Sequence, residues 1–484
     1  MCWLEDRGGP IERFSQSLLL RTPDGLGRDA LVAAVATLTR HHDALRGRLA
    51  PATPGERRSL EIRPAGTVSA SESVHVVDVT GHSAGQLRTC VEREAEAATA
   101  WLSPREGRLA RYVWFDAGPG RPGRLLILVH HLAVDGVSWR ILVPDLLAAL
   151  TGGRLHPVGT SVRGWSRLLR SRALLPEVVA ELPWWKRTLS GADPLMTARS
   201  LDPARDVSGT AEQLTTTLPP DVTEPLLTSV PTAFHAGVQD VLLTALALAL
   251  GHFRRERGHG EDGGVLIDVE GHGRDEDGSG ADLSRTVGWF TCLYPARLDP
   301  GAHAWEDVTS GGAGVDAACK RVKEQMRAVP GHGRGYGLLR YLNAHTAAEL
   351  AGLPLPQIGF NYVGRFPAPG APIVPEHPRW QVADEIGLVG GSDPGLPLAH
   401  GLEVNAAVRD HADGPRLTAT WTWAPGMWPE ADVRAVADHW FQALRGLARH
   451  GSGQGSGGFT PSDFPLVGLD QHDVEQLEDL WRSR

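Results

Sequence analysis

A chain of 484 residues is too long for one ordinary hydrophobic core, so we expect two large lobes. Hydrophobic residues make up 42% and charged residues 22% of the chain, which is typical of a folded soluble protein and excludes a disordered or fibrous one. The net charge of -9 argues against nucleic acid as a partner, because phosphate binding needs a clustered basic surface. No Cys-x-x-Cys spacing, secretory leader or apolar run of roughly 18 residues occurs, so we expect a cytoplasmic protein without a membrane partner.

The first part of the chain alternates helical and strand patterns. Apolar residues at helical spacing predict an amphipathic helix within residues 28–46. A strand at 74–79 is followed by a helical segment at 86–98. The continuous apolar run at 125–129 is typical of a strand buried on both faces, and 141–150 reads as a helix. This order predicts a mixed α/β lobe.

Periodicity is lost between residues 182 and 205, where prolines and glycines gather, so we place the main lobe boundary there. The expected units are an N-terminal lobe at 1–195, a C-terminal lobe at 196–450, and a Gly/Ser linker with a connector at 451–484. Helical and strand patterns continue through the second lobe and the tail. These are a helix at 238–252, strands at 265–270, 357–363 and 417–423, and helices at 433–447 and 470–481.

Two histidines follow the apolar strand, in the segment HHLAVDG that begins at His130. Strand alternation predicts that His130 and His131 point to opposite faces, so they do not converge as a catalytic pair or on one metal ion. Asp135 is near enough to pair with a cation, and Gly136 allows a tight turn. An imidazole suits acid–base chemistry, because its unperturbed pKa is about 6.5. A buried strand end with two incidental histidines is the equal alternative.

A second candidate group stands at the strand that ends at Glu270, where Leu266, Asp268 and Glu270 share one face. A carboxylate at a strand end is often only solvated. An acid facing His131 across a cleft would, however, complete a two-base arrangement. The double histidine at His41 lies at the end of a helix and is interpreted as structural.

The segment Gly81 to Gly85 matches the Gly-x-Ser-x-Gly pattern of serine hydrolases, between a strand and a helix. The alternative is that Ser83 caps the helix, with Gln86 three residues later completing a capping box. The pattern alone leaves both interpretations open.

Taken together, these residues resemble the epimerization domains within the condensation-domain superfamily of nonribosomal peptide synthetases. The signature H-H-x-x-x-D-G stands here as HHLAVDG, and VSWRILVPDL continues it in the epimerization form. The superfamily uses no serine nucleophile, so the resemblance favours a helix cap at Ser83. Further blocks follow in the expected order: VEGHGRDE at 269–276, RTVGWFTCLYP at 285–295, GYGLLRYL at 335–342, FNYVGRF at 360–366, and a connector-like PSDFPLVGLDQ at 461–471.

The resemblance implies an α/β fold of two chloramphenicol-acetyltransferase-like lobes, in a V-shaped pseudo-dimer around a central tunnel. It implies epimerization of an L-aminoacyl or peptidyl thioester on the phosphopantetheine arm of a carrier protein. It also implies no cofactor or metal of the domain's own, an upstream carrier domain, a downstream condensation domain and a monomeric chain. The usual proline-containing first block is missing before Met1, so we expect the first structural element to be absent.

By the same resemblance, His131 and Glu270 transfer the two protons, and the order in which they act stays open. Supporting roles fall to His130, Asp135 and Gly136 as structural residues, to Arg285 and Asn361 as site-shaping or polarising groups, to Tyr362 near the enolate, and to Ser138 and Trp289 as tunnel-wall candidates. Asn361 and Tyr362 lie on opposite faces of an ideal strand, so both reach the tunnel only if the strand has a bulge.

Two alternatives belong to the same superfamily. In a peptide-bond-forming condensation domain the second histidine serves an incoming amine, and Glu270 counts against this interpretation. A catalytically silent recruitment module would be free to lose His131, Asp135 and Glu270, and all three are present.

Overall fold

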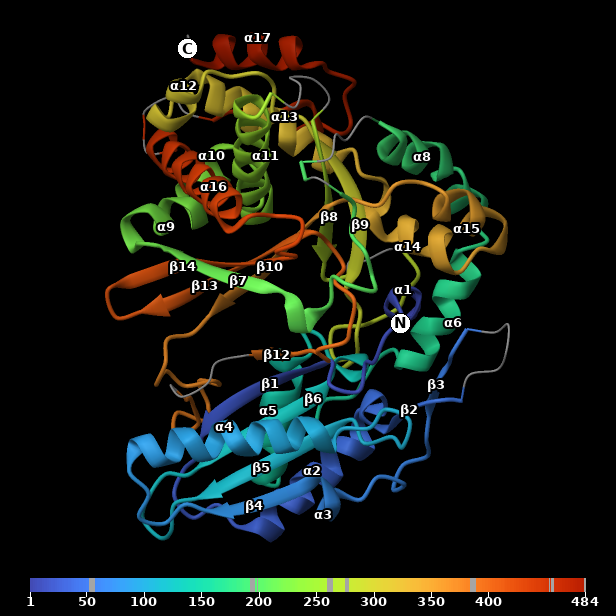
Figure 1. Cartoon of the computed structure of the whole chain (residues 1–484), viewed down its shortest axis with the longest axis vertical. Coiled ribbons are helices and arrows are strands. Elements are labelled where there is room, and N and C mark those ends of the chain that lie inside the picture. The colour runs from blue at the N-terminus through green and yellow to red at the C-terminus, as the bar shows by residue number, and fades with distance from the viewer. Residues whose placement is uncertain are drawn as a thin grey trace.

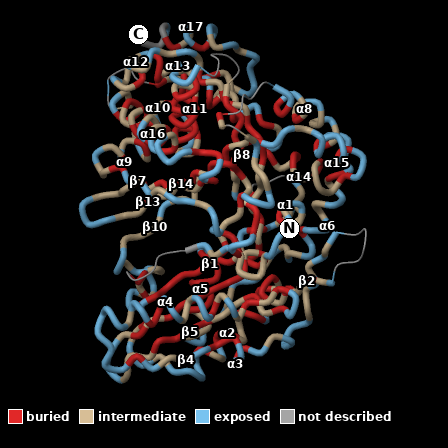
Figure 2. The backbone as a smooth tube through the Cα atoms, in the orientation of Figure 1, coloured by how far each residue is buried: buried red, intermediate tan, exposed pale blue. Residues whose placement is uncertain are grey.

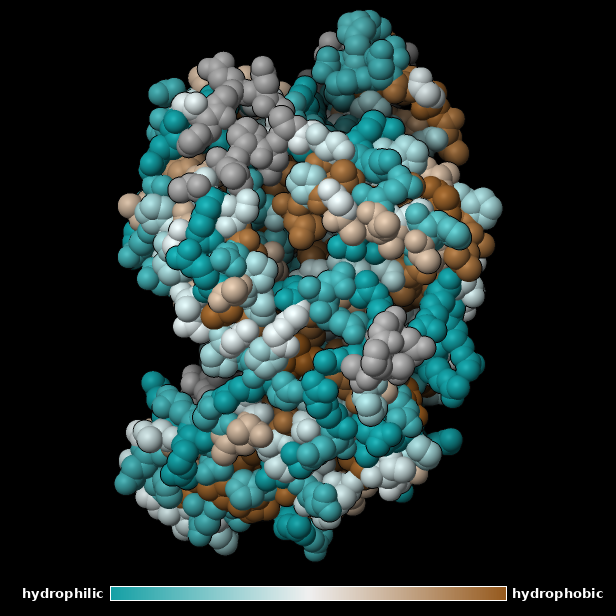
Figure 3. Space-filling view, turned by 45° about the vertical axis from the view of Figure 1, so that its right-hand side comes forward, coloured by the Kyte–Doolittle hydropathy of each residue, from teal (hydrophilic) through white to brown (hydrophobic). Residues whose placement is uncertain are grey.

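The computed structural model describes residues 1–51, 57–191, 196–197, 199–258, 264–274, 278–383, 389–451, 453 and 457–482. Its strands form two six-stranded sheets, one in each lobe, and the first lies below the second in Figure 1. The buried segments gather in two bodies, one around each sheet (Figure 2). The space-filling view shows a waist between the two halves of the molecule (Figure 3).

The sheet of the N-terminal lobe has the order β11-β1-β6-β5-β4, and β12 also pairs with β1. Its strands are β1 (Ser15–Arg21), β4 (Val74–Asp78), β5 (Ala110–Asp116), β6 (Arg124–His130), β11 (Gln381–Val382) and β12 (Val389–Gly391). Helices α2 (Arg28–His41) and α5 (Trp139–Leu150) share one hydrophobic cluster with this sheet, and α4 (Ala84–Trp101) shares another. The sheet is therefore covered on both faces.

Strand β6 shows why a continuous apolar run predicts a strand that is buried on both faces. Leu125, Ile127 and Val129 join the cluster that contains α2 and α5, whereas Leu126 and Leu128 join the cluster that contains α4. A continuous apolar run satisfies both faces, because successive side chains of a strand point in opposite directions. The predicted doubly buried strand is confirmed.

The sheet of the C-terminal lobe has the order β7-β14-β13-β10-β8-β9. Its strands are β7 (Glu212–Leu218), β8 (Val265–Gly271), β9 (Cys292–Leu298), β10 (Ile358–Phe366), β13 (Leu402–His411) and β14 (Gly414–Trp423). Several helices cover the upper face of this sheet (Figure 1). They are α9 (Pro220–Leu227), α10 (Ser229–Ala233), α11 (Val238–Glu256), α12 (Trp305–Ser310), α13 (Ala313–Arg327) and α16 (Glu430–His450).

The remaining elements lie around these two bodies. A small hairpin is formed by β2 (Gly47–Leu49) and β3 (Leu60–Ile62). The other helices are α1 (Cys2–Arg7), α3 (Ala70–Ser73), α6 (Val162–Arg172), α7 (Pro176–Val179), α8 (Leu182–Ser190), α14 (Arg334–Tyr341), α15 (Ala344–Ala351) and α17 (Gln471–Arg482). Within the described ranges no single helix could span a bilayer, and only the sharply bent pair Pro220–Ala233 and Val238–Glu256 has the length and composition.

The structure adds two details to the predicted organisation. The residues around the expected lobe boundary, 192–195, lie outside the described part of the chain, as do residues 452 and 454–456 of the expected Gly/Ser linker and residues 275–276 of the carboxylate block. Strands β11 and β12, counted with the C-terminal lobe from the sequence, pair with β1 in the N-terminal sheet. The second half of the chain therefore crosses back to complete the first sheet.

Candidate active site

One face of the C-terminal sheet is polar where β8, β10 and β13 run side by side. On each strand the apolar residues, such as Val269, Phe360 and Val404, belong to the core beneath the helices. Alternation therefore turns the intervening residues to the opposite face, which we call the polar face. It carries Asp268 and Glu270 on β8, Asn361 on β10, and Glu403 and Asn405 on β13.

Glu270 lies at the end of β8 on this polar face. Burial raises the pKa of its carboxyl group to about 7, and the negative charge of Glu403 adds to the shift. A carboxyl group with such a pKa is about half protonated at neutral pH, so it can either donate or accept a proton.

Polar groups with hydrogen bonds among themselves surround Glu270. Nε2 of His400 lies 3.0 Å from a carboxylate oxygen of Asp268, and its Nδ1 lies 3.8 Å from Glu403. Burial opposes a charge on this imidazole, but the hydrogen bond to Asp268 and the negative charges of Asp268 and Glu403 raise the pKa of His400 to about 9. The amide of Asn405 donates to Glu403 over 2.8 Å, and that of Asn361 donates to Asn405 over 3.1 Å.

His131 differs from its predicted position in one respect. Strand β6 ends at His130, and His131 begins a short 3-10 helix (His131–Ala133) instead of continuing the strand. Its ring is stacked on Phe14, with centroids 4.8 Å apart, and lies 4.6 Å from Trp289. Burial lowers the pKa of His131 to about 4, so the imidazole is neutral at physiological pH and able to accept a proton.

Gln16 orients His131. The indole N–H of Trp139 donates to Oε1 of Gln16 over 2.7 Å, and Nε2 of Gln16 lies 3.0 Å from Nε2 of His131. Because an indole N–H only donates, this bond turns the amide nitrogen of Gln16 toward His131. The amide therefore donates to Nε2, and the neutral imidazole carries its proton on Nδ1, which has no hydrogen-bond partner in the described part of the chain.

His130 points elsewhere and has different partners. Its Nε2 lies 2.7 Å from the carbonyl oxygen of Ile11, and its Nδ1 accepts the backbone N–H of Leu132 over 3.1 Å. Burial lowers the pKa of His130 to about 4. Both ring nitrogens are engaged with the backbone, so this imidazole braces the turn after β6.

Asp135 joins the two lobes. Its carboxylate accepts hydrogen bonds from the guanidinium of Arg274 at 3.0 and 3.1 Å and from the backbone N–H of Phe290 at 3.1 Å. The backbone N–H of Ser138 donates to it over 2.8 Å, and the Ser138 hydroxyl, which has a single proton, lies 2.8 Å from the same carboxylate oxygen and 3.0 Å from the carbonyl oxygen of Gly288. Ser138, expected at the tunnel wall, is thus buried in this interlobe hub.

Gly136 does not have the conformation for which a glycine was expected. It is absent from the described residues with positive φ, and a Cβ placed on it would meet no atom within 4 Å. The tight turn after His131 therefore does not depend on a glycine at this position.

Arg285 lies beside the first lobe's helices. Its guanidinium donates to one carboxylate oxygen of Asp145, while the other oxygen lies 2.9 Å from Nε2 of His42. None of the contacts described for Arg285 reaches His131 or Glu270. The structure therefore places Arg285 with the end of α2 and with α5, away from the polar face.

The pairing of β10 with β13 shows whether a bulge turns Asn361 and Tyr362 to the same face. The pairing with β13 shifts between Tyr362 and Gly364, so the bulge follows Tyr362. Asn361 keeps its place on the polar face, whereas Tyr362 packs against the hydrophobic core. Strand alternation thus separates the two side chains, and Asn361 alone of the pair joins the Glu270 network.

Helix α1 connects the surroundings of His131 with the polar face. Trp289 meets Trp3 edge-on at 6.3 Å, and the guanidinium of Arg7 lies 4.6 Å from the ring centroid of Trp3. Burial lowers the pKa of Arg7 to about 10, while the negative charge of Glu403 opposes that shift. The side chains of α1 therefore extend from Trp289, beside His131, to a guanidinium on which the charge of Glu403 acts.

Four residues of the site were not predicted from the sequence: Gln16, Arg7, His400 and Glu403. A signal existed for Glu403, because it and Asn405 alternate with Leu402, Val404 and Ala406, as expected for a strand with one polar face. The other three stand in segments without a pattern that points to the site.

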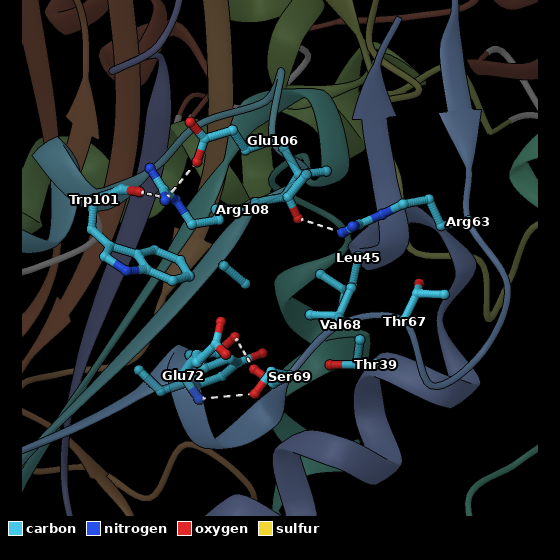
Figure 4. A pocket seen from close by; sticks show the side chains of 15 residues that line it. Thr39, Leu45, Arg63, Thr67, Val68, Ser69, Glu72, Trp101, Glu106 and Arg108 are labelled. Atoms are coloured by element: carbon cyan, nitrogen blue, oxygen red, sulfur yellow. Dashed lines mark hydrogen bonds and ion pairs between the residues drawn. The ribbon is translucent and has the colours of Figure 1, made fainter.

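Two cavities lie outside this constellation. The one in Figure 4 is lined by Arg63, Trp101 and Arg108, among others, from the first lobe. Its arginines are already engaged, because Arg63 donates to the carbonyl oxygen of Gly107 over 2.8 Å and Arg108 lies 2.6 Å from Glu106. The second cavity lies beside α1. Neither is lined by His131 or Glu270.

Ser83 is a helix cap. Its N–H donates to the side chain of Gln86 over 2.9 Å, and the N–H of Gln86 donates back to the Ser83 hydroxyl over 3.4 Å. This completes the capping box at the start of α4. The capping interpretation is confirmed.

Comparison with known proteins gives a consistent result. The model of the Condensation domain family matches residues 10–464. The chain is 32% identical over 98% of its length to part of a linear gramicidin synthase of Brevibacillus parabrevis, and 34% identical over 97% to a chondramide synthase of Chondromyces crocatus. It spans only 6% and 11%, respectively, of the length of these two relatives.

Solved structures show the same architecture. The epimerization domain from the third module of tyrocidine synthetase B matches with a TM-score of 0.75 and 25% identity, over 93% of this chain and 94% of that one. The X-domain from teicoplanin biosynthesis matches with a TM-score of 0.62 and 19% identity, over 94% of both chains. The second likeness concerns the fold alone.

Proposed function

This chain belongs to the Condensation domain family, and we propose that it inverts the α-carbon of an aminoacyl or peptidyl thioester held on the phosphopantetheine arm of a carrier protein. The predicted family and the fold of two chloramphenicol-acetyltransferase-like lobes are confirmed. Within the family, the likeness to an epimerization domain supports this activity over peptide-bond formation.

The observation that carries the proposal is the opposite protonation preference of His131 and Glu270. Stereoinversion needs a base on one side of the α-carbon and an acid on the other. His131 is neutral at physiological pH, whereas Glu270 keeps a large protonated fraction. One group takes the α-proton, the other delivers a proton to the opposite side, and the reverse reaction exchanges their roles. On His131 the proton is taken up at Nε2, the nitrogen without a proton, so the Gln16 amide has to release that nitrogen.

The carrier-borne arm is substrate in this proposal, and the domain itself supplies no cofactor. Since the relatives are far longer than this chain, we propose that it works beside an upstream carrier domain and a downstream condensation domain. Glu270 also supports the proposal over its alternatives. A peptide-bond-forming domain or a silent recruitment module has no need of a carboxyl group whose pKa is poised near 7.

The direct test loads a carrier protein with an L-aminoacyl group and follows exchange of the α-proton in deuterated solvent. We expect exchange and formation of the D residue with the wild-type chain. Both Glu270→Gln and His131→Ala should lower the rate of D-product formation by at least about 100-fold, the typical contribution of a general acid or base.

Ser83→Ala is the matched control and should keep the wild-type rate, because Ser83 only caps α4. Wild-type exchange no faster than that of the loaded carrier alone would refute epimerization. Formation of an amide product with an added acceptor would instead support the condensation alternative.

A further inference from the structure

Three ligand-bearing side chains converge between the two long helices of the C-terminal lobe. His252 and Glu256 lie one turn apart on α11, and His439 faces them from α16. One ligand atom from each lies within 4.8 Å of the others. Figure 1 shows α11 and α16 together above the sheet, so this group is separated from Glu270 by the sheet itself.

Both imidazoles lie too far from Glu256 for ordinary hydrogen bonds, at separations close to those between ligands of one metal ion. Nε2 of His252 lies 3.4 Å from one carboxylate oxygen of Glu256, and Nε2 of His439 lies 3.6 Å from the other. Both exceed the usual N–H···O range of about 2.7 to 3.2 Å. Ligands at about 2.0 to 2.1 Å from a tetrahedral zinc ion are about 3.4 Å apart.

Trp305 fixes both imidazoles. Its ring is stacked on His252 with centroids 4.1 Å apart, and it meets His439 edge-on at 5.3 Å. The indole N–H donates to Gln442 over 3.0 Å, which holds the tryptophan in place. The His252 and His439 side chains are only 15% and 13% exposed, whereas Glu256 is 49% exposed, so the group is preformed but open to solvent on one side.

The charges around the group favour a cation overall. Glu306 and Asp438 lie close enough to act on the two imidazoles, and Arg255 is the opposing cation. With Glu256 included, three carboxylates and one guanidinium act on the two imidazoles.

A second triad, formed by His41, His42 and Asp145, is not free to bind a metal ion. Nε2 of His42 is hydrogen-bonded to Asp145, whose other oxygen is taken by the guanidinium of Arg285. Nε2 of His41 lies 2.8 Å from the carbonyl oxygen of His156. An arginine already occupies the place of a cation there.

We propose that His252, Glu256 and His439 bind a divalent transition-metal ion of the zinc class, with water completing its coordination. Two imidazoles and one carboxylate suit such an ion, and the ligands come from different helices. The ion would stabilise the packing of α11 on α16.

The test is a calorimetric titration of the chelator-treated full chain with zinc chloride. We expect one ion bound per chain, with an affinity at least about tenfold lower in His439→Gln and in Glu256→Gln. His41→Gln, the matched control in the second triad, should bind like the wild type. Unchanged binding in both cluster variants, or loss of the site in His41→Gln, would overturn the proposal.

Thermal unfolding gives a second readout that does not involve activity. Saturating zinc should raise the melting temperature of the wild type, because the ion binds the folded state, and should leave that of His439→Gln unchanged. An equal rise in both proteins would also overturn the proposal.

Discussion

His131 and Glu270 are tuned in opposite directions mainly by the same cause, burial. Burial destabilises the charged form of any group, so it lowers the pKa of an imidazole and raises that of a carboxyl group. The two pKa values, about 4 and about 7, leave a neutral base and a protonated acid together between those limits.

The pH dependence of the reaction follows from these directions. Where His131 takes the proton, activity needs a neutral imidazole and a protonated Glu270. The rate should therefore fall below about pH 4 and again above about pH 7. Initial rates of D-product formation across the pH range measure both limbs, and a rate that keeps rising from pH 7 to 9 would contradict this assignment of roles.

Gln16 is a positioning residue in this scheme, because its amide donates to Nε2 of His131. A donor facing Nε2 disfavours a proton on that atom and so helps to keep the imidazole neutral. Gln16→Leu should raise the pKa of His131 and move the acid limb of the pH profile to higher pH. Gln16→Glu should move it further, because a carboxylate stabilises the imidazolium. An acid limb unmoved in both variants would show that Gln16 only fills space.

Most helices and strands were predictable from the sequence. Where a predicted element differs from the structure, as at the end of β6, the cause is a local side-chain contact. The apolar run before His130 predicts β6 because its residues satisfy two hydrophobic clusters. The same alternation wrongly extends the strand to His131. The ladder ends there because Nδ1 of His130 captures the N–H of Leu132 and turns the chain into a 3-10 helix. A side chain that bonds the backbone two residues onward leaves no periodic signal.

Gly273 and Gly136 both lie near the interlobe hub, but only the backbone conformation of Gly273 requires a glycine. Gly273 has φ of 65°, and a Cβ on it would lie 1.8 Å from the carbonyl oxygen of Phe290. Gly273→Ala should therefore lower the free energy of unfolding by more than about 1 kcal/mol, since backbone atoms must move. Gly136→Ala should change it by less than about 0.5 kcal/mol. Urea denaturation of both variants measures the difference, and equal effects would contradict the backbone argument.

At the scale of the whole molecule, the sequence predicts two lobes because each half carries its own helical and strand patterns. It does not predict how they interlock. Strands β11 and β12 are only two and three residues long, too short for alternation to be visible, yet they pair with β1. His400 and Glu403 were missed for a related reason, because their importance depends on strands that are far apart in the sequence.

The interlobe hub at Asp135 should stabilise the whole molecule. Arg274 and Asp135 are both buried, with side chains 7% and 3% exposed, and the backbone N–H of Phe290 adds a further bond to the carboxylate. Asp135→Asn removes the charge that compensates the guanidinium, and removing one partner of a buried ion pair costs roughly 3 to 5 kcal/mol.

Urea denaturation should therefore show a large loss of stability in Asp135→Asn, and the rate of D-product formation should fall with it, because the hub lies next to Trp289 and His131. Asp410→Asn is the matched control. It breaks the exposed pair with Arg365, whose side chain is 54% exposed, and such pairs contribute roughly 0 to 1 kcal/mol. If both variants lost the same stability, the Asp135–Arg274 pair would stabilise the protein no more than an exposed ion pair. The other interlobe contacts, among them the Arg285–Asp145 ion pair and the shared strands, would then hold the two lobes together.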